Sequence, residues 1–349
     1  MIKHISIRNF RGFNSLDAKL CRRVTVIVGD NGVGKTALLE AIMLALSSSP
    51  VAAWRLKQTR GFDGAFRGTR SDIEETFVGD YFHLFDMEKP ISIELRGEGA
   101  ESRTLKIEKG RASTTVHFNA GEQSQEIDVP IQFTWTDNRG TARTVAPKIS
   151  PTGIAFDDTG EQLPHFFFFG ASQPILASET AERFSALSKK NKEKEFVKMF
   201  SKEYPWIQDL TVQASTGVPM LYATVAGAKQ KIPINATSSA VARVLTILLS
   251  LCARKGGVLS VDEIENGIYH KHQERVWKMI LDFSKEYSSQ IFVTSHSAEA
   301  LYALQRAAGD EIEDIAFWRL ERGDDQQISL SEFEGKDFSL ALDYNYEVR

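Results

Sequence analysis

The sequence predicts an α/β fold with a central, mostly parallel sheet, an antiparallel β subdomain and a helical insertion. Three observations support this prediction. Apolar β-formers at 24–28 lead through a glycine-rich loop into a helical pattern at 36–46. Two further apolar strands, within 257–263 and 290–296, flank an amphipathic helical stretch, and this alternation is typical of a parallel sheet. Several short runs in 90–135 alternate apolar and polar side chains, as expected for antiparallel strands.

The remaining elements follow in chain order. Residues 2–8 alternate as a half-buried strand does, and 15–20 form its partner after a turn at Arg11 and Gly12. The run HFFFFG at 165–170 predicts a fully buried strand. Helical patterns follow, and they cover 174–203 (as one helix or two), 238–253, 268–287 and the stretch from 297 onward. The acidic stretches 310–314 and 321–325 are interpreted as solvated turns.

Composition excludes several classes of protein. The chain has 349 residues, 42% of them apolar and 25% charged, and a formal net charge of −4, so no global positive field attracts nucleic acid. Cys21 and Cys252 are interpreted as buried thiols in a reducing compartment. The N-terminus lacks a signal-peptide pattern, and no run of about 18 apolar residues is present. We therefore expect a cytoplasmic protein without membrane contact.

The segment Gly29-Asp30-Asn31-Gly32-Val33-Gly34-Lys35-Thr36 fits the phosphate-binding loop G-x-x-x-x-G-K-[ST]. It lies between a strand and a helix, which is the context that this motif requires. The glycines let backbone N–H groups surround phosphates, Lys35 reaches the β- and γ-phosphates, and the Thr36 hydroxyl binds Mg²⁺. The expected cofactors are ATP and Mg²⁺, and the expected contact residues are Asn31, Gly32, Val33, Gly34, Lys35, Thr36 and Ala37.

Two further strands end in residues suited to phosphate chemistry. Asp262 and Glu263 end the strand in VLSVDE, at the sheet edge where doubly wound folds bind ligands. Asp262 would hold Mg²⁺, and Glu263 would orient and deprotonate the attacking water. His296 ends the strand in IFVTSH and can contact the γ-phosphate and that water. Alternatively, His296 is incidental to a segment in which Ser295 or Ser297 caps the next helix.

In their order along the chain, these motifs resemble those of the ABC-type ATPases of the SMC/RecF/OLD group. The resemblance is carried by ISIRNFRGF with VGDNGVGKT, and by VDEIENGIYHKHQERVWKMI with QIFVTSHS. The nearest resemblance is to the stand-alone OLD-like AAA ATPases of bacterial anti-phage defence systems. It implies an ABC-type ATPase head in which 1–46 and 232–349 form the nucleotide-binding core, and 47–231 is a β-rich and helical insertion that completes the head.

The resemblance also implies a head-to-head dimer or higher homo-oligomer in which two heads enclose two ATP molecules. The signature segment that would face the partner's nucleotide corresponds to 235–251, where Ser238 and Ser239 could bind a phosphate. Ala240 replaces an expected glycine, so we expect either weak activation by the partner head or slow, switch-like hydrolysis. Simple helix capping by Thr237 or Ser238 is the alternative interpretation.

Other residues carry weaker resemblances. Arg11 corresponds to a position near the nucleotide, or it is a surface turn residue. The stretch 265–267 matches a loop that crosses the dimer interface. The glutamine of the family's glutamine loop cannot be assigned among Gln58, Gln123, Gln132 and Gln173.

Two functional hypotheses follow from the resemblance. The C-terminal nuclease domain of the OLD nucleases has no counterpart here, which favours an ATP-driven switch acting on a partner effector such as a nuclease or toxin. The alternative is a RecF-like DNA-binding ATPase of repair or maintenance. Its DNA would lie along basic patches at Arg60, Arg67, Arg70 and the lysines at 189–194. An ABC transporter motor fits the opening and insertion less well.

Overall fold

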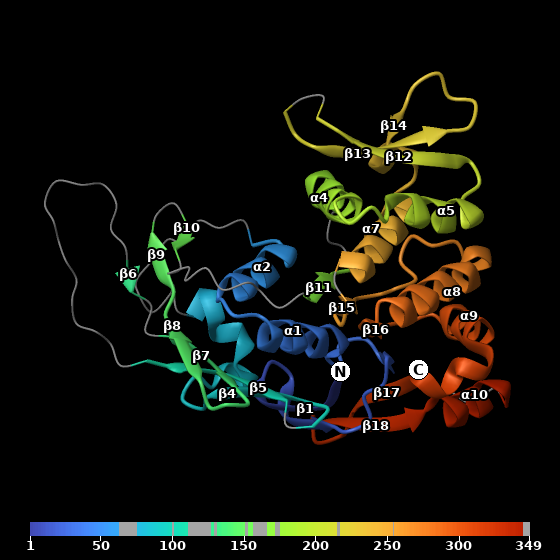
Figure 1. Ribbon diagram of the computed structural model, residues 1–349. Helices are drawn as coiled ribbons and strands as arrows, with labels where there is room; N and C mark the ends of the chain where they lie inside the picture. Colours follow the sequence, from blue (N-terminus) through green and yellow to red (C-terminus); the bar gives the residue numbers. More distant parts are fainter. Residues whose placement is uncertain are drawn as a thin grey trace, which may run out of the picture.

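The computed structural model describes residues 1–62, 75–99, 101–110, 127–128, 131–150, 153–155, 166–171, 175–214, 217–253 and 255–344. Within these ranges, no helix is both long enough and apolar enough to cross a lipid bilayer. The predicted arrangement of a parallel sheet, an antiparallel sheet and a helical insertion is confirmed, and Figure 1 shows it as stacked layers.

The central sheet has the strand order β11-β15-β16-β3-β17-β18. The first five strands are mutually parallel, and β18 pairs with β17 in the antiparallel direction. Because β15, β16 and β3 are adjacent and parallel, their carboxyl ends lie side by side. Their bounds are β3 (Val24–Gly29), β11 (Phe166–Phe169), β15 (Val258–Val261), β16 (Gln290–Thr294), β17 (Ile315–Arg322) and β18 (Ile328–Glu334).

The second six-stranded sheet is antiparallel and has the order β2-β1-β4-β5-β7-β8. It joins the two N-terminal strands to strands of the 47–231 segment, just as β11 of that segment joins the central sheet. The bounds are β1 (Ile2–Phe10), β2 (Phe13–Ala18), β4 (Ile91–Gly97), β5 (Ser102–Lys109), β7 (Ile131–Asp137) and β8 (Ala142–Val145). A small sheet of β6 (Ile127–Asp128), β9 (Lys148–Ser150) and β10 (Gly153–Ala155) lies beyond it.

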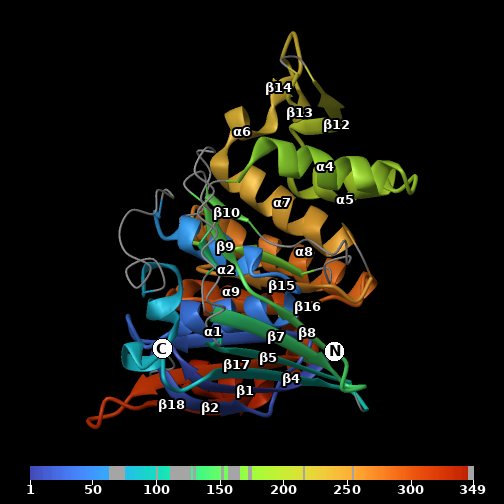
Figure 2. The same cartoon turned by 90° about the vertical axis from the view of Figure 1, so that its left-hand side faces the viewer.

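Helix α1 (Lys35–Leu46) lies between the two large sheets (Figures 1 and 2). Ten of its twelve residues are buried, because one side packs on β4 and β5 and the other on the central sheet. Its apolar residues share one core with the antiparallel sheet and with Phe292 and Trp318 of the central sheet. The helix that follows the phosphate loop is therefore held on both sides.

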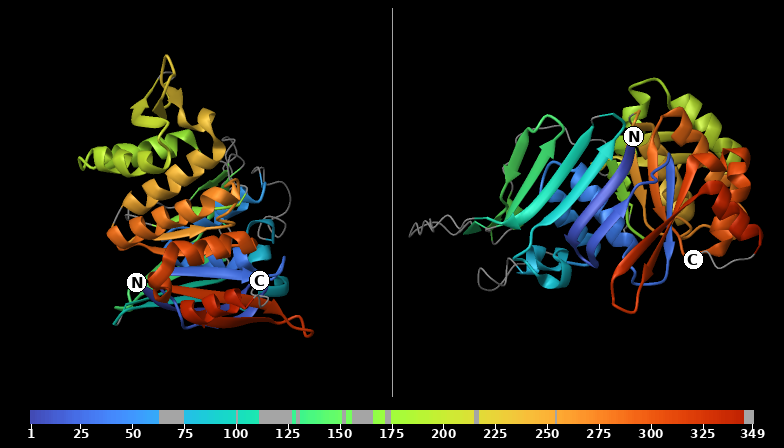
Figure 3. Two further views of the ribbon diagram at one scale, coloured as in Figure 1. Left: turned by 90° about the vertical axis from the view of Figure 1, so that its right-hand side faces the viewer. Right: turned by 90° about the horizontal axis from the view of Figure 1, so that it is seen from below.

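A second core covers the opposite face of the central sheet. It contains α7 (Ser239–Ala253), α8 (His270–Glu286) and α9 (Ala298–Ala308), and outside them α4 (Ala177–Ser188) and α5 (Glu193–Glu203). The three-stranded sheet β12 (Ile207–Gln213), β13 (Met220–Val225) and β14 (Ile232–Pro233) forms the outermost layer, as the left view of Figure 3 shows. Other helices are α2 (Val51–Thr59), α6 (Ile234–Thr237), α10 (Gly335–Asp343) and the short 3-10 helices η1 (Gly79–Tyr81), η2 (His83–Phe85) and η3 (Gly309–Asp314).

Two details of the sequence interpretation are wrong. The run 166–169 is an edge strand of the central sheet, so Phe166, Phe167 and Phe168 are half-buried instead of fully buried. The stretch 321–325 is only partly a turn, because Glu321 and Arg322 end β17 in a hairpin with β18. Because the turn of this hairpin is acidic, the sequence did not indicate its second strand, β18, which is the sixth strand of the central sheet.

Candidate functional site

The phosphate loop connects β3 to α1 in a conformation that requires glycine at two positions. Gly29 has φ +135°, and a Cβ there would lie 2.2 Å from the carbonyl oxygen of Leu320. Gly34 has φ +96°, and a Cβ there would meet the ring of Phe13 at 2.9 Å. Both backbone conformations are ones that L side chains rarely adopt. Gly29 and Gly34 therefore allow the loop to turn from the carboxyl end of β3 into α1.

The N-terminus of α1 has the features of an anion-binding site. Gly34 is its N-cap and provides no side-chain hydrogen bond, so the N–H groups of the first turn have no partner within the helix. Such N–H groups, at the positive end of the helix dipole, bind phosphate. Val33 and Ala37 are buried beneath the loop, whereas Asn31 and Gly32 are exposed at its tip. Arg322 of β17 donates to the Gly32 carbonyl at 3.0 Å and braces that tip.

Lys35 is folded into the loop. Its Nζ donates to the carbonyl oxygens of Gly29 at 2.6 Å and Asp30 at 2.7 Å. Burial lowers the pKa of Lys35, and the nearby carboxylates, Asp262 first among them, oppose that shift. The ammonium group is thus held inside the phosphate loop by weak carbonyl partners that a phosphate could replace.

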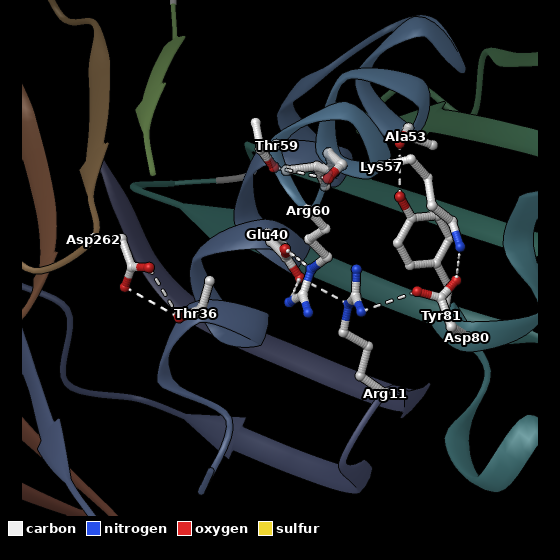
Figure 4. Close-up of polar contacts among 11 residues, drawn as sticks. Arg11, Thr36, Glu40, Ala53, Lys57, Thr59, Arg60, Asp80, Tyr81 and Asp262 are labelled. Atoms are coloured by element: carbon white, nitrogen blue, oxygen red, sulfur yellow. Dashed lines mark hydrogen bonds and ion pairs between the residues drawn. The ribbon is translucent and has the colours of Figure 1, made fainter. Parts of the chain in front are cut away.

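Asp262 follows β15 and meets the first turn of α1 across 226 residues of sequence. The Thr36 hydroxyl donates to Asp262, at 3.0 Å from Oδ2 and 3.2 Å from Oδ1, as Figure 4 shows. The Thr294 hydroxyl of β16 donates to Asp262 Oδ1 at 2.6 Å. A hydroxyl and a carboxylate in contact are oxygen ligands of the kind that Mg²⁺ prefers, so these residues fit the predicted ion.

Glu263 lies beside Asp262 in an unusual backbone conformation. Its φ is +48°, and its N–H donates to the Thr294 hydroxyl at 2.8 Å. The same threonine therefore fixes Asp262 and Glu263. Within the described ranges the Glu263 carboxylate has no hydrogen-bond or ion-pair partner, and the residue is half-buried. A strained residue with a free carboxylate at a strand end is typical of functional sites.

His296 follows β16 and is half-buried beside the same strand end. Its backbone N–H donates to Glu265 Oε1 at 2.7 Å. Ser297 is the N-cap of α9 and accepts from the Ala300 N–H at 3.1 Å, so the capping expected of this segment is present as well. Capping by Ser297 and a role for the His296 ring are compatible, because they involve different groups.

Arg243 is a residue that the sequence did not single out. It lies on α7 and is 8% exposed, and its Nη2 donates to the carbonyl oxygens of Asp262 at 2.8 Å and Glu263 at 3.3 Å. Burial lowers its pKa, against the opposing effect of the carboxylates at Asp262, Glu263 and Glu265. Arg243 thus connects the helix of the signature segment to the backbone of the predicted catalytic pair.

Ser238 and Ser239 lie at the start of α7, where the Ala242 N–H donates to the Ser238 carbonyl at 2.9 Å. Neither serine side chain contacts the phosphate loop through a hydrogen bond in the described part of the chain. Instead, Ser239 borders a groove of about 300 Å³. The groove is lined by Ile175, Asn235, Ser239, Ala240, Ala242, Arg243, Asn266 and Gly267.

Arg11 lies in the turn after β1, as one interpretation of the sequence proposed, but its side chain is largely buried instead of lying on the surface. Its φ is +49°, and its Nε lies 2.7 Å from Glu40 Oε2 while Nη1 lies 3.3 Å from Asp80 Oδ2. Figure 4 shows its guanidinium between these two carboxylates, with Arg60 also on Glu40 and Lys57 on Asp80. Glu40 is one helical turn beyond Thr36, so this cluster adjoins the phosphate loop.

The cluster predicts a large stability effect. Glu40 is 1% exposed, and its removal in Glu40→Ala would leave Arg11 buried without its main carboxylate partner. Breaking a buried pair in this way costs roughly 3–5 kcal/mol, or roughly 5–10 °C in melting temperature. A thermal melt should show this loss, whereas Glu274→Ala, which breaks the exposed pair with Arg306, should shift the melt by about 1 °C or less. Equal shifts would contradict the assigned role of the cluster.

The structure therefore brings together Lys35, Thr36, Asp262, Glu263 and His296 at adjacent strand ends. Of the candidates for the glutamine loop, Gln58 and Gln132 lie on α2 and β7, and Gln123 and Gln173 lie outside the described residues, as do Arg67 and Arg70. Sequence reasoning missed Thr294, Arg243, Glu40 and the hydrogen bond from His296 to Glu265. The apolar strand end preceding His296 could have directed attention to Thr294.

Comparisons with known proteins agree with this geometry. Residues 24–301 match the AAA_21 family, described as "AAA domain, putative AbiEii toxin, Type IV TA system". The chain is 47% identical over 53 residues to the "DNA replication and repair protein RecF" of Paenarthrobacter aurescens, covering 15% of this chain. It is 29% identical over 130 residues to the "DNA double-strand break repair Rad50 ATPase" of Methanopyrus kandleri, covering 37%. The matched part spans 13% of the length of either relative.

A solved structure supports the fold. The "SmcHead bound to the C-winged helix domain of ScpA" superposes with a TM-score of 0.50 at 15% identity, covering 97% of this chain and 99% of that one. The SMC-head-like fold predicted from the sequence is thereby confirmed. The family match extends over 24–301, well over half of the 349 residues. The chain therefore belongs to the AAA_21 family of AAA-type ATPases, within the SMC, RecF and Rad50 group.

Proposed function

We propose that this chain binds and hydrolyses ATP, dimerises head to head on ATP, and acts as a switch for a partner effector protein, such as a nuclease or toxin, in anti-phage defence. One observation supports the ATPase part above all others. The phosphate loop, the Thr36–Asp262 contact and the carboxylate of Glu263 meet at adjacent strand ends. A phosphate loop alone would support binding, whereas the free carboxylate beside it supports hydrolysis.

Each residue has a role that follows from its position. The first-turn N–H groups of α1 and the Lys35 ammonium bind the β- and γ-phosphates. Thr36 and Asp262 would hold Mg²⁺, which when bound neutralises charge on the phosphates. Glu263 accepts a proton from the attacking water. His296 contacts the γ-phosphate and that water and orients them. Thr294 keeps Asp262 and Glu263 in register, since its hydroxyl contacts both.

The placement of the signature segment supports dimerisation. Ser239 begins α7 and borders a groove that its own phosphate loop does not line, and Ser238 precedes it directly. A second head would bring its phosphate loop to this groove and so complete two sites. Ala240 in place of glycine restricts backbone approach to a phosphate there, which supports slow, switch-like hydrolysis.

The effector role rests on the family. The family's description names a toxin of a type IV toxin–antitoxin system, and this supports a setting in which an ATPase and an effector act together. The partner would respond to the open or closed state of the heads. We expect a partner protein to purify with the chain and to dissociate when ATP is added.

DNA binding is the second candidate, and a surface feature favours it. Lys194, Lys198 and Lys202 form a stripe along α5, exposed and without an ion-pair partner among the described residues. They border a groove of about 470 Å³. The RecF and Rad50 relatives are named as DNA repair proteins. Binding through such lysines would weaken steeply with salt.

The test is phosphate release from ATP by the purified chain with and without Mg²⁺, alongside the affinity for a fluorescent ATP analogue. We expect binding in both conditions, release only with Mg²⁺, and no stimulation by duplex DNA. Stimulation by DNA that vanishes at high salt would favour the second candidate. Absence of ATP binding would contradict both.

A further inference from the structure

Glu265 contacts the backbone of His296 from the neighbouring strand end. It follows β15 by four residues, and its Oε1 accepts the His296 N–H at 2.7 Å. Charge-assisted hydrogen bonds from a carboxylate to a backbone N–H are about twice as strong as neutral ones. One side chain thus links the loops that follow β15 and β16.

Other elements hold the residues on either side of His296. The Ser295 N–H donates to the carbonyl of Ile27 in β3 at 3.2 Å, and Ser297 caps α9. Neither contact involves the N–H of His296 itself. Among the described residues, Glu265 provides the hydrogen bond to that N–H, and so it sets the direction in which His296 leaves the strand.

The second oxygen of this carboxylate shows that a structural ion pair does not explain its position. Glu265 Oε2 is buried and has no hydrogen-bond partner, and no ion pair to Glu265 is present in the described ranges. A buried polar atom without a partner costs about 1–3 kcal/mol. Buried carboxylate oxygens normally have a partner, so an unpartnered one needs an explanation, and a role at a functional site is one such explanation.

We propose that Glu265 is a positioning residue, which fixes His296 at the phosphate end of the site by holding its backbone N–H. This inference rests on the proposed function and goes beyond the interface role that resemblance implies for 265–267. Glu265 acts within its own protomer, whereas Asn266 and Gly267 border the groove where a second head would dock. A glutamine at 265 would keep the accepting oxygen, and an alanine would remove it.

The first test needs no nucleotide. Hydrogen exchange of the peptide covering 295–297 is measured by mass spectrometry on the wild type, Glu265→Ala and Glu265→Gln. We expect exchange in this peptide to be at least tenfold faster in the alanine variant and within threefold of wild type in the glutamine variant. Glu274→Ala, which removes an exposed carboxylate on α8, is the control and should leave the peptide unchanged. Unchanged exchange in Glu265→Ala would overturn the proposal.

The second test is turnover and ATP affinity. We expect Glu265→Ala to lower kcat about tenfold, with analogue affinity within threefold of wild type, and Glu265→Gln to restore most of the rate. Combined with His296→Ala, the alanine variant should add no further loss, because both changes disable the same group. A glutamine variant as slow as the alanine variant would overturn positioning in favour of a direct chemical role.

These outcomes are separable from failure of the proposed function. If the wild-type chain neither binds nor hydrolyses ATP, the proposed function fails while the exchange experiment still reports on the contact. If wild type hydrolyses ATP and Glu265→Ala matches it in rate and exchange, only the positioning role fails.

Discussion

Lys35→Met is expected to weaken ATP binding roughly 100-fold. The substitution keeps an apolar stem but removes a cation that would make charge-assisted hydrogen bonds to phosphate, each worth about 1.5–3 kcal/mol, and a loss of 2.7 kcal/mol corresponds to about 100-fold. Titration with a fluorescent ATP analogue measures the change. The fold should survive, because an apolar methionine can occupy this buried position. Among the described residues, the hydrogen bonds lost are those to the carbonyls of Gly29, at the buried end of β3, and Asp30.

A matched control separates this effect from a general loss of charge. Lys336→Met removes an exposed lysine that pairs with Glu313 and lies far from the phosphate loop in the sequence. It should bind the analogue as wild type does. An affinity of Lys35→Met within threefold of wild type would show that the loop is a structural turn, and the phosphate-binding assignment would have to be withdrawn.

Glu263→Gln is expected to lower turnover at least 100-fold while leaving ATP affinity within threefold. General-base catalysis contributes about 10²–10⁴ in rate, and the amide cannot accept the proton. The side chain keeps its shape, and the backbone bond to the Thr294 hydroxyl is unaffected. Phosphate release at saturating ATP is the measurement.

Glu274→Gln, which neutralises an exposed carboxylate on α8, serves as the control and should retain full turnover. If Glu263→Gln also hydrolyses ATP at the wild-type rate, another group activates the water. Glu265 would then be the first candidate, since its second oxygen is buried without a hydrogen-bond partner in the same loop after β15.

The parts of the site that the sequence predicted share one property. Lys35, Asp262 and His296 each follow an apolar run, and the carboxyl ends of parallel strands converge at one sheet edge. The motif spacing therefore carried geometric information without any contact being known. The prediction of the site did not require the strand order to be known, because β15, β16 and β3 are neighbours in the central sheet.

The residues that the sequence did not reveal act through contacts between distant segments. Arg243 matters because α7 places its guanidinium on the carbonyls of Asp262 and Glu263. Glu40 looks like an ordinary helix residue until Arg11 and Arg60 meet it. Such roles depend on tertiary packing, which periodicity does not encode.

The same limit explains the errors in the fold. The phenylalanines at 166–169 have the composition of a central strand, yet they form an edge strand. Whether a strand is central or at an edge depends on how many strands pair with it, which its own residues do not show. The β17–β18 hairpin was missed because Ile315–Trp318 is apolar without alternation and the turn that follows is acidic. A strand buried on both faces cannot be distinguished from a helix by periodicity alone.

The central claim is that ATP closes two heads and hydrolysis opens them. Light scattering of Glu263→Gln with and without ATP and Mg²⁺ tests it most directly, because this variant should hold ATP without turning it over. We expect a mass of 39.0 kDa without nucleotide and twice that value with it, while the wild type returns to the lower mass as ATP is consumed. A mass that is the same with and without nucleotide in both proteins would show that ATP does not drive dimerisation.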